Sequence, residues 1–138
     1  MPEVLVDTSV WSLALRRRGA GRLDEAAAEL EELILNMNVR IIGPIRQEIL
    51  SGIRDHRQFE SLRLRLRAFP DLDLEEEDYE RAAEIFNQCR AMGIQGSNTD
   101  FLICAVAERR GLSVFTADQD FHSYQKCARF SLHRARIQ

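Results

Sequence analysis

Short apolar runs alternate with longer stretches of helical periodicity along this chain, and this alternation limits the fold more than any other feature. We interpret as strands the apolar runs at residues 4–6, 39–42, 72–74, 113–116 and 130–133. Strands that alternate with helices predict a parallel sheet with helices on both of its faces. The expected class is therefore α/β, and 138 residues suit one domain that spans residues 1–138.

Between these runs, apolar residues recur every three or four positions, as in helices that bury one face. We expect helices over residues 11–15, 23–37, 44–53, 59–69, 76–92 and 98–110, and a loop over 117–121. Pro44 favours a helix start, and Gly111 is a typical helix C-cap. The last of these helices is apolar almost all round, which predicts that it is buried. The acidic residues crowded into 71–80 predict a solvated helix start.

The composition excludes several classes of protein. Hydrophobic residues make up 45 % of the chain and charged residues 30 %, and no apolar segment approaches the ~18 residues of a transmembrane helix. The N-terminal residues lack the basic and apolar regions of a secretory signal, so the expected location is cytoplasmic. Three cysteines without a close pair (Cys89, Cys104 and Cys127) suggest neither a disulfide framework nor a zinc site.

The net charge of −3 does not by itself favour nucleic acid, but the basic residues are unevenly placed. Of 19 basic residues 18 are arginine, the better bidentate partner for phosphate. Genome composition explains the same bias equally well. The basic residues gather in the run Arg16-Arg17-Arg18, in the stretch from Arg54 to Arg67, and in an acid-free tail with Lys126, Arg129, Arg134 and Arg136.

Four acidic residues fall at expected junctions between elements: Asp7, Glu48, Asp100 and Asp118, with Asp120 close by. Ligands of open parallel sheets bind outside the carboxyl ends of the strands, and Asp7, Glu48 and Asp118 are expected at that edge. The rule leaves the edge of Asp100 open, because its helix leads into a strand. Each acid also has an ordinary explanation, as an N-cap, a surface group, a partner of the helix dipole or an Asx-turn. Their joint placement favours a functional site.

Carboxylates that gather without a positive partner repel one another, and a divalent cation relieves that repulsion. Hard oxygen ligands suit Mg²⁺ or Mn²⁺, so the four acids predict metal-dependent phosphodiester chemistry. Other chemistries find less support. His56, His122 and His133 show no spacing that makes a pair, and the chain has no G-x-S-x-G, Walker A or G-x-G-x-x-G motif.

Four motifs around these acids resemble those of PIN-domain ribonucleases, specifically the toxin subunit of VapBC-type toxin–antitoxin pairs. They are Val6-Asp7-Thr8-Ser9-Val10-Trp11, Gly43-Pro44-Ile45-Arg46-Gln47-Glu48-Ile49-Leu50, the stretch from Gly96-Ser97-Asn98-Thr99-Asp100 to Ala107, and Phe115-Thr116-Ala117-Asp118-Gln119-Asp120-Phe121. Their order and spacing span nearly the whole chain. The resemblance implies a PIN-like three-layer α/β/α fold with a central parallel sheet, and it places Asp100 in the pocket. It also implies a small antitoxin protein as partner and a homodimer of toxins.

The activity that this resemblance implies is cleavage of RNA to leave a 5′-phosphate. Mg²⁺ or Mn²⁺ held by Asp7, Glu48, Asp100 and Asp118 would bind the scissile phosphate and lower the pKa of a bound water. We favour Asp118 over Asp120 as the fourth acid. The short polar groups beside the acids are interpreted as holders of carboxylates or waters, with ordinary helix capping as the alternative for Asn98. They are Thr8, Ser9, Asn98, Thr116 and Asp120.

An acidic pocket repels phosphate, so RNA should be held by arginines around it. Our candidates are Arg16, Arg17, Arg18, Lys126, Arg129, Arg134 and Arg136. An antitoxin helix is expected in a groove near Trp11 and Phe59, although for Trp11 itself core packing is favoured over a place in the interface. Two other functions remain: phosphoryl transfer on an aspartate, and a non-catalytic RNA-binding module of PIN-like fold.

Overall fold

A parallel sheet forms the centre of the fold. The computed structural model describes residues 3–16 and 25–134. Its strands are β1 (Val4–Val6), β2 (Val39–Arg40), β3 (Ser113–Phe115) and β4 (Ser131–Leu132), in the order β2-β1-β3-β4. Val4 pairs with Val39 on one side and with Ser113 on the other, and every pairing is parallel. The expected α/β class with a central parallel sheet is confirmed.

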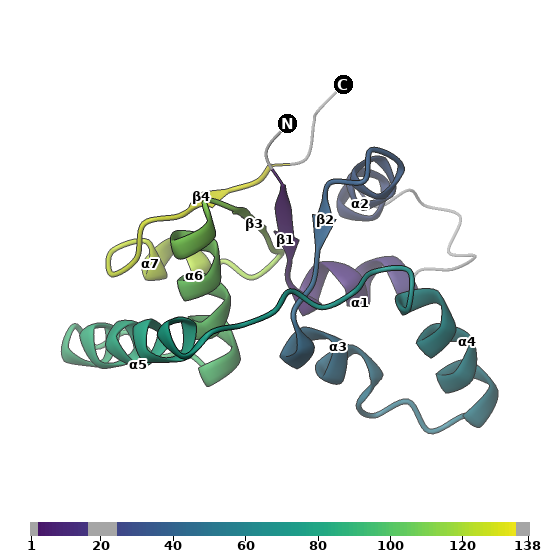
Figure 1. Cartoon of the computed structure of the whole chain (residues 1–138), viewed down its shortest axis with the longest axis horizontal. Helices are drawn as coiled ribbons and strands as arrows, with labels where there is room; N and C mark the ends of the chain where they lie inside the picture. Colours follow the sequence, from purple (N-terminus) through teal and green to yellow (C-terminus); the bar gives the residue numbers. More distant parts are fainter. Residues whose placement is uncertain (1–2, 17–24, 135–138) are drawn as a thin grey trace.

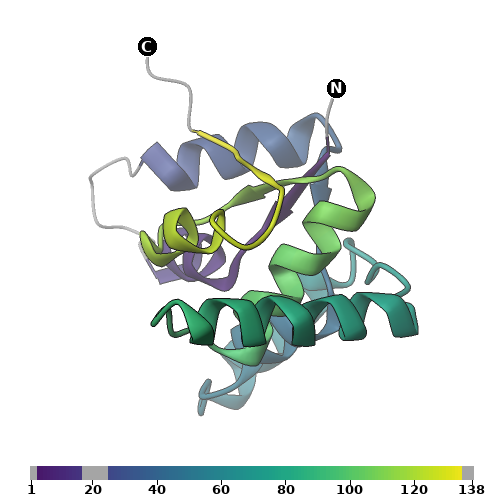
Figure 2. The same cartoon turned by 90° about the vertical axis from the view of Figure 1, so that its left-hand side faces the viewer.

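Helices cover both faces of this sheet (Figure 1). One layer contains α1 (Thr8–Arg16), α2 (Glu25–Leu35), α3 (Gly43–Leu50) and α4 (His56–Leu66), and the other contains α5 (Glu76–Ala91), α6 (Asn98–Arg110) and α7 (Asp120–Tyr124). Figure 2 shows α5 lying across α6. None of the described helices is long and apolar enough to cross a membrane.

The core lies where the sheet meets α6. All three residues of β1 are buried, and so is every residue of α6 from Phe101 to Ala107. A parallel sheet covered on both faces requires strands that are apolar on both sides, as the run Val4-Leu5-Val6 is. Trp11 also belongs to this core, because it is 4 % exposed and its indole N–H donates to the Val6 carbonyl. Of the two expectations for Trp11, core packing is therefore correct.

Two expectations about elements are wrong. Residues 72–74 do not form a strand: the segment makes one isolated bridge, between Ile41 and Asp71, and the N–H of Leu72 donates to the Ile41 carbonyl before the chain turns away. The expected loop over 117–121 gives way to α7 at Asp120. Burial of Phe121 in the first turn of α7 stabilises this helix, which is too short to show a clear period in the sequence.

The acidic stretch is not wholly solvated either. Asp78, in the first turn of α5, is fully buried and forms ion pairs with Arg109 (2.6 Å) and Arg110 (2.9 Å) at the end of α6. Burial opposes ionisation of this carboxyl, but the N–H of Glu75 and the two guanidinium groups outweigh it and hold its pKa below the ordinary value. The ion pairs fasten α5 to α6 at the end of α6 opposite Asp100.

Candidate active site

Asp7 is the centre of the candidate site. It follows β1 directly, is 6 % exposed, and its N–H donates to the carbonyl of Phe115 at the end of β3. Its Oδ2 accepts hydrogen bonds from the hydroxyls of Ser9 and Thr116, both at 2.8 Å. A buried carboxylate that accepts two hydroxyl donors is held in one orientation at the carboxyl edge of the sheet.

The same two hydroxyls tie Asp118 to this place. The Ser9 and Thr116 oxygens lie 3.2 Å apart. Ser9 Oγ accepts from the N–H of Ala117 (2.9 Å), and Thr116 Oγ1 accepts from the N–H of Asp118 (3.0 Å). Ser9 and Thr116 therefore join the end of β1 to the end of β3, in addition to holding the Asp7 carboxylate as the sequence predicted.

Asp100 reaches the same edge from α6. A helix that runs directly into a parallel strand runs antiparallel to it, so α6, about 20 Å long, begins at the carboxyl end of β3. Asp100 also serves as a helix cap: its N–H donates to Ser97 Oγ (3.1 Å), and its Oδ2 accepts from the Ser97 N–H (3.3 Å). Capping and a role in the site are therefore compatible at this residue.

The electrostatics of Asp100 indicate that two other acids, Asp7 and Asp118, lie near it. Burial raises its pKa, and the negative charges of Asp7 and Asp118 raise it further, against hydrogen bonds from Ser97 and Tyr124. Within residues 3–16 and 25–134, none of the four candidate acids forms an ion pair with a basic side chain. Like charges are thus brought together without a compensating ion pair in the described part of the chain.

Tyr124 was not anticipated from the sequence. It is 1 % exposed, and its hydroxyl donates to Asp100 Oδ2 at 3.1 Å and lies 3.3 Å from the carbonyl oxygen of Gln95. Burial and the charges of Asp100, Asp120 and Asp118 raise its pKa, so it stays a neutral donor. No motif marks this residue, because its position depends on how α7 packs against α6.

Glu48 joins the site through a neighbour of Asp7. It is exposed on α3, and its Oε1 accepts a hydrogen bond of 2.7 Å from Thr8 Oγ1. Asp120 is exposed at the start of α7, where its N–H donates to Asp118 Oδ1 at 2.9 Å in the expected Asx-turn. Asn98 is also exposed, and in the described part of the chain its side chain makes no hydrogen bond to any of the four acids.

The donor set of the site suits a hard divalent cation. Its groups are carboxylate oxygens and hydroxyls, the ligands that Mg²⁺ and Mn²⁺ prefer. Among the described residues, no group of three or more His, Cys, Asp or Glu side chains is placed so that it could hold a metal ion. Mg²⁺ commonly takes only one or two carboxylates and keeps several waters, so the acids fit such an ion without forming a complete protein cage.

The basic candidates are placed in different regions. Arg17, Arg18 and Arg136 lie outside the described residues, as does the side chain of Arg16. Lys126 is exposed just after α7, and the N–H of Arg129 donates to Glu108, two turns along α6 from Asp100. Arg134 lines a pocket together with Asp118.

Comparison with known proteins identifies the family to which this chain belongs. A family model described as the PIN domain matches residues 4–126. This chain belongs to the PIN domain family. The PIN domain described here is similar to VapC ribonuclease Mb1587 of Mycobacterium bovis and to Ribonuclease VapC11 of Mycobacterium tuberculosis. Each is 34 % identical to it over 122 residues, which make up 86 % of this chain and 88 % of each relative.

Solved structures share the fold of this PIN domain. FitAcB from Neisseria gonorrhoeae is 24 % identical, with a TM-score of 0.72 over 93 % of this chain and 96 % of that one. VapBC2 from Rickettsia felis, bound to a promoter DNA fragment, is 18 % identical, with a TM-score of 0.74 over 94 % and 96 %. A toxin–antitoxin complex from Klebsiella pneumoniae is 21 % identical, with a TM-score of 0.61 over 86 % and 90 %. The expected PIN-like three-layer architecture is confirmed.

Proposed function

We propose that this PIN domain is a Mg²⁺- or Mn²⁺-dependent endoribonuclease that acts as the toxin of a toxin–antitoxin pair. One observation carries the proposal: Asp7, Asp100 and Asp118 lie at the carboxyl edge of the sheet with no ion-pair partner among residues 3–16 and 25–134, and the charges of two of them raise the pKa of the third. The names of the VapC ribonucleases, similar over most of the chain, support RNA as the substrate.

The residues of the site have different proposed roles. Asp7, Asp100 and Asp118 would hold the ion together with Glu48, and the bound ion would activate water and stabilise charge on the phosphodiester. Ser9 and Thr116 donate to Oδ2 of Asp7 and so fix that carboxylate for a cation. Tyr124 does the same for Asp100. These hydroxyls set the positions of the carboxylates in advance, which lowers the cost of assembling the site.

A groove beside the acids suits the antitoxin. It has a volume of about 930 Å³ and runs between α1, α3 and α4, with Leu15, Ile49 and Leu62 among its apolar lining residues and Glu48 among its polar ones. An amphipathic helix fits such a groove with its apolar face. Because Glu48 belongs to the proposed site, a basic side chain on that helix would reach the acids and compete with the cation.

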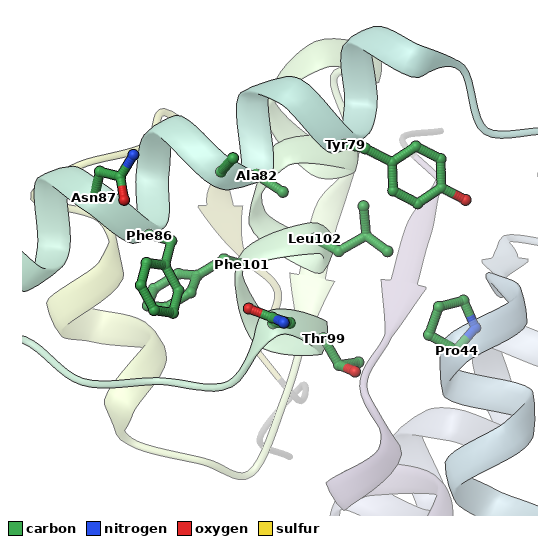
Figure 3. A pocket seen from close by; sticks show the side chains of 10 residues that line it. Pro44, Tyr79, Ala82, Phe86, Asn87, Thr99, Phe101 and Leu102 are labelled. Atoms are coloured by element: carbon green, nitrogen blue, oxygen red, sulfur yellow. The ribbon is translucent and has the colours of Figure 1, made fainter.

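A second copy of this chain is the proposed occupant of another groove, of about 470 Å³, between α5, α6 and α3 (Figure 3). Its lining includes Tyr79, Ala82 and Phe86 of α5, opposite Pro44 of α3. Tyr79 is 54 % exposed, and exposed aromatic side chains are enriched at interfaces. Light scattering should show a dimer for the wild type and a monomer for Tyr79→Glu. A wild-type monomer would contradict this assignment.

The test of the proposed activity is cleavage of RNA by the purified chain with and without Mg²⁺ or Mn²⁺. Asp7→Asn and Asp100→Asn should abolish cleavage while both variants stay folded, because an amide oxygen still accepts the hydroxyl donors. Mg²⁺ should raise the melting temperature of the wild type by mass action, and Asp7→Asn should reduce that rise. Full activity in both variants would refute the mechanism.

The toxin role has a separate test. The chain should arrest growth when it is expressed alone, with cleavage of cellular RNA, and should not do so together with the protein encoded next to it. If active chain is harmless alone and no partner copurifies with it, a housekeeping nuclease is the better description.

A further inference from the structure

A third pocket, of about 400 Å³, opens beside Asp118 of the acid site. It shares Thr116 and Asp118 with the candidate active site, and its lining residues come from the end of β3, the start of α7, the end of β4 and the start of α2 at Glu25. Its volume falls within the range of about 300–1,000 Å³ that is common for sites of small ligands. A ligand group that enters this pocket therefore lies next to any ion or phosphate bound by the acids.

Three side chains that suit an anionic, aromatic ligand line this pocket: His122, His133 and Arg134. The sequence showed no spacing that pairs the histidines, yet α7 and β4 bring two of them to one cavity. Within the described residues, the side chains of His122 and Arg134 form no hydrogen bond or ion pair, and both residues are exposed. Their donors remain available to a phosphate, and an arginine is always charged.

The ring of His133, in contrast, is fixed. Its Nε2 lies 2.6 Å from Oε2 of Glu29, which is 4 % exposed on α2. The ring packs against Phe115 edge to face at 5.2 Å between centroids, and the His133 N–H donates to the Val114 carbonyl at 2.8 Å. A planar ring held by Glu29 and Phe115, on a backbone fixed by the Val114 hydrogen bond, offers a stacking surface for a base at little cost in conformational entropy.

We infer that this pocket binds one nucleotide of a single-stranded RNA next to the phosphate that is cleaved. Arg134 and His122 contact its phosphate, and its base stacks on the ring of His133. Single-stranded RNA is recognised in this way, through splayed bases on aromatic rings and phosphates on basic groups. The inference rests on the proposed ribonuclease function, and it explains how an acidic centre retains an anionic substrate: the guanidinium group of Arg134 and the imidazole N–H of His122 lie in a pocket that also contains Asp118.

The test uses the full chain and a short, end-labelled single-stranded RNA of mixed sequence. Arg134→Ala and His122→Ala are compared with the wild type and with Arg67→Ala. Arg67 is exposed at the end of α4, on the other side of the sheet, so its loss removes one positive charge without touching the pocket. Thermal melting checks that each variant is folded, as the exposure of all three residues predicts.

Binding is measured in EDTA at several salt concentrations, and cleavage in Mg²⁺. Arg134→Ala and His122→Ala should each weaken RNA binding about three- to tenfold. Arg134→Ala should reduce the salt dependence of binding by about 0.7 of a unit of slope, because one charged phosphate contact is lost. Both variants should raise KM more than they lower kcat.

The two possible failures give different results. If the wild type cleaves no RNA, the proposed function is wrong, and the nucleotide pocket is refuted as well. If the wild type cleaves RNA, but both pocket variants bind and cleave it as Arg67→Ala does, the ribonuclease function stands and the nucleotide pocket alone is refuted.

Discussion

A single added methyl group tests how the buried wall of the acid site is built. In Gly96→Ala the new Cβ would lie 2.5 Å from Tyr124 Oη and 2.8 Å from Phe101 Cζ, closer than real Cβ contacts. The two rings are buried and pack edge to face, 5.0 Å between centroids, so neither can withdraw freely. The backbone at Gly96 is not in the left-handed region, and the cost of the substitution is therefore steric.

Two effects set the size of the cost of Gly96→Ala in stability. Overpacking of a buried site costs about 1–3 kcal/mol. A displaced Tyr124 also loses its hydrogen bond to the Asp100 carboxylate, and a hydrogen bond to a charged group is worth about 1.5–3 kcal/mol. We expect Gly96→Ala to lower the free energy of unfolding by about 2–4 kcal/mol and the melting temperature by roughly 10 °C. RNA cleavage should fall at least about tenfold, since ~1.4 kcal/mol in the barrier is a factor of ten.

Urea unfolding of four variants separates these effects. Gly43→Ala is the matched control, because its Cβ would meet nothing nearer than Asp71 Oδ2 at 3.7 Å, and it should stay within about 0.5 kcal/mol of the wild type. Tyr124→Phe removes the atom that makes the shortest contact. The double variant Gly96→Ala/Tyr124→Phe should therefore be more stable than the sum of the single effects by about 1 kcal/mol or more. Additive effects, or a neutral Gly96→Ala, would refute the described packing.

Three further predictions concern titratable groups. The pKa of Asp100 is raised, so its ionised form destabilises the metal-free fold above that pKa. Asp100→Asn should therefore raise the melting temperature at neutral pH. The variant should lose this advantage over the wild type as the pH falls, because the wild-type carboxyl then takes up a proton. The pKa of Asp78 is lowered, so its stabilisation is present above the unfolded pKa and disappears as the pH falls through the folded one. Asp78→Asn should cost about 3 kcal/mol at neutral pH, and far less in acid-titrated unfolding curves. Burial raises the pKa of Cys89 to about 12, so a thiol reagent near neutral pH should label Cys127 well before Cys89. Peptide mass spectrometry measures the labelling of each cysteine, and equal labelling of the two would contradict the burial of Cys89.

Local signals in the sequence carried most of the element assignments. Pro44 stands at the start of α3, Ser97 caps α6 as its position indicated, and Gly111 ends α6 in the left-handed conformation with φ of 67°. These features act over one helical turn, so the residues that decide them are neighbours in the chain. The run 72–74 and helix α7 were assigned wrongly because both are short, and packing decides the conformation of short segments more than propensity does.

The sequence by itself determined the α/β class, the carboxyl-edge positions of Asp7 and Asp118, and, through the resemblance of four motifs, the PIN family. Tertiary structure alone decided which distant groups meet those residues. Tyr124 on Asp100, the burial of Asp78 between two arginines, and His122 beside His133 all join residues of different elements. The physical reason is that periodicity records which face of an element is apolar, whereas the angle and the offset at which two faces pack follow from the side chains of both.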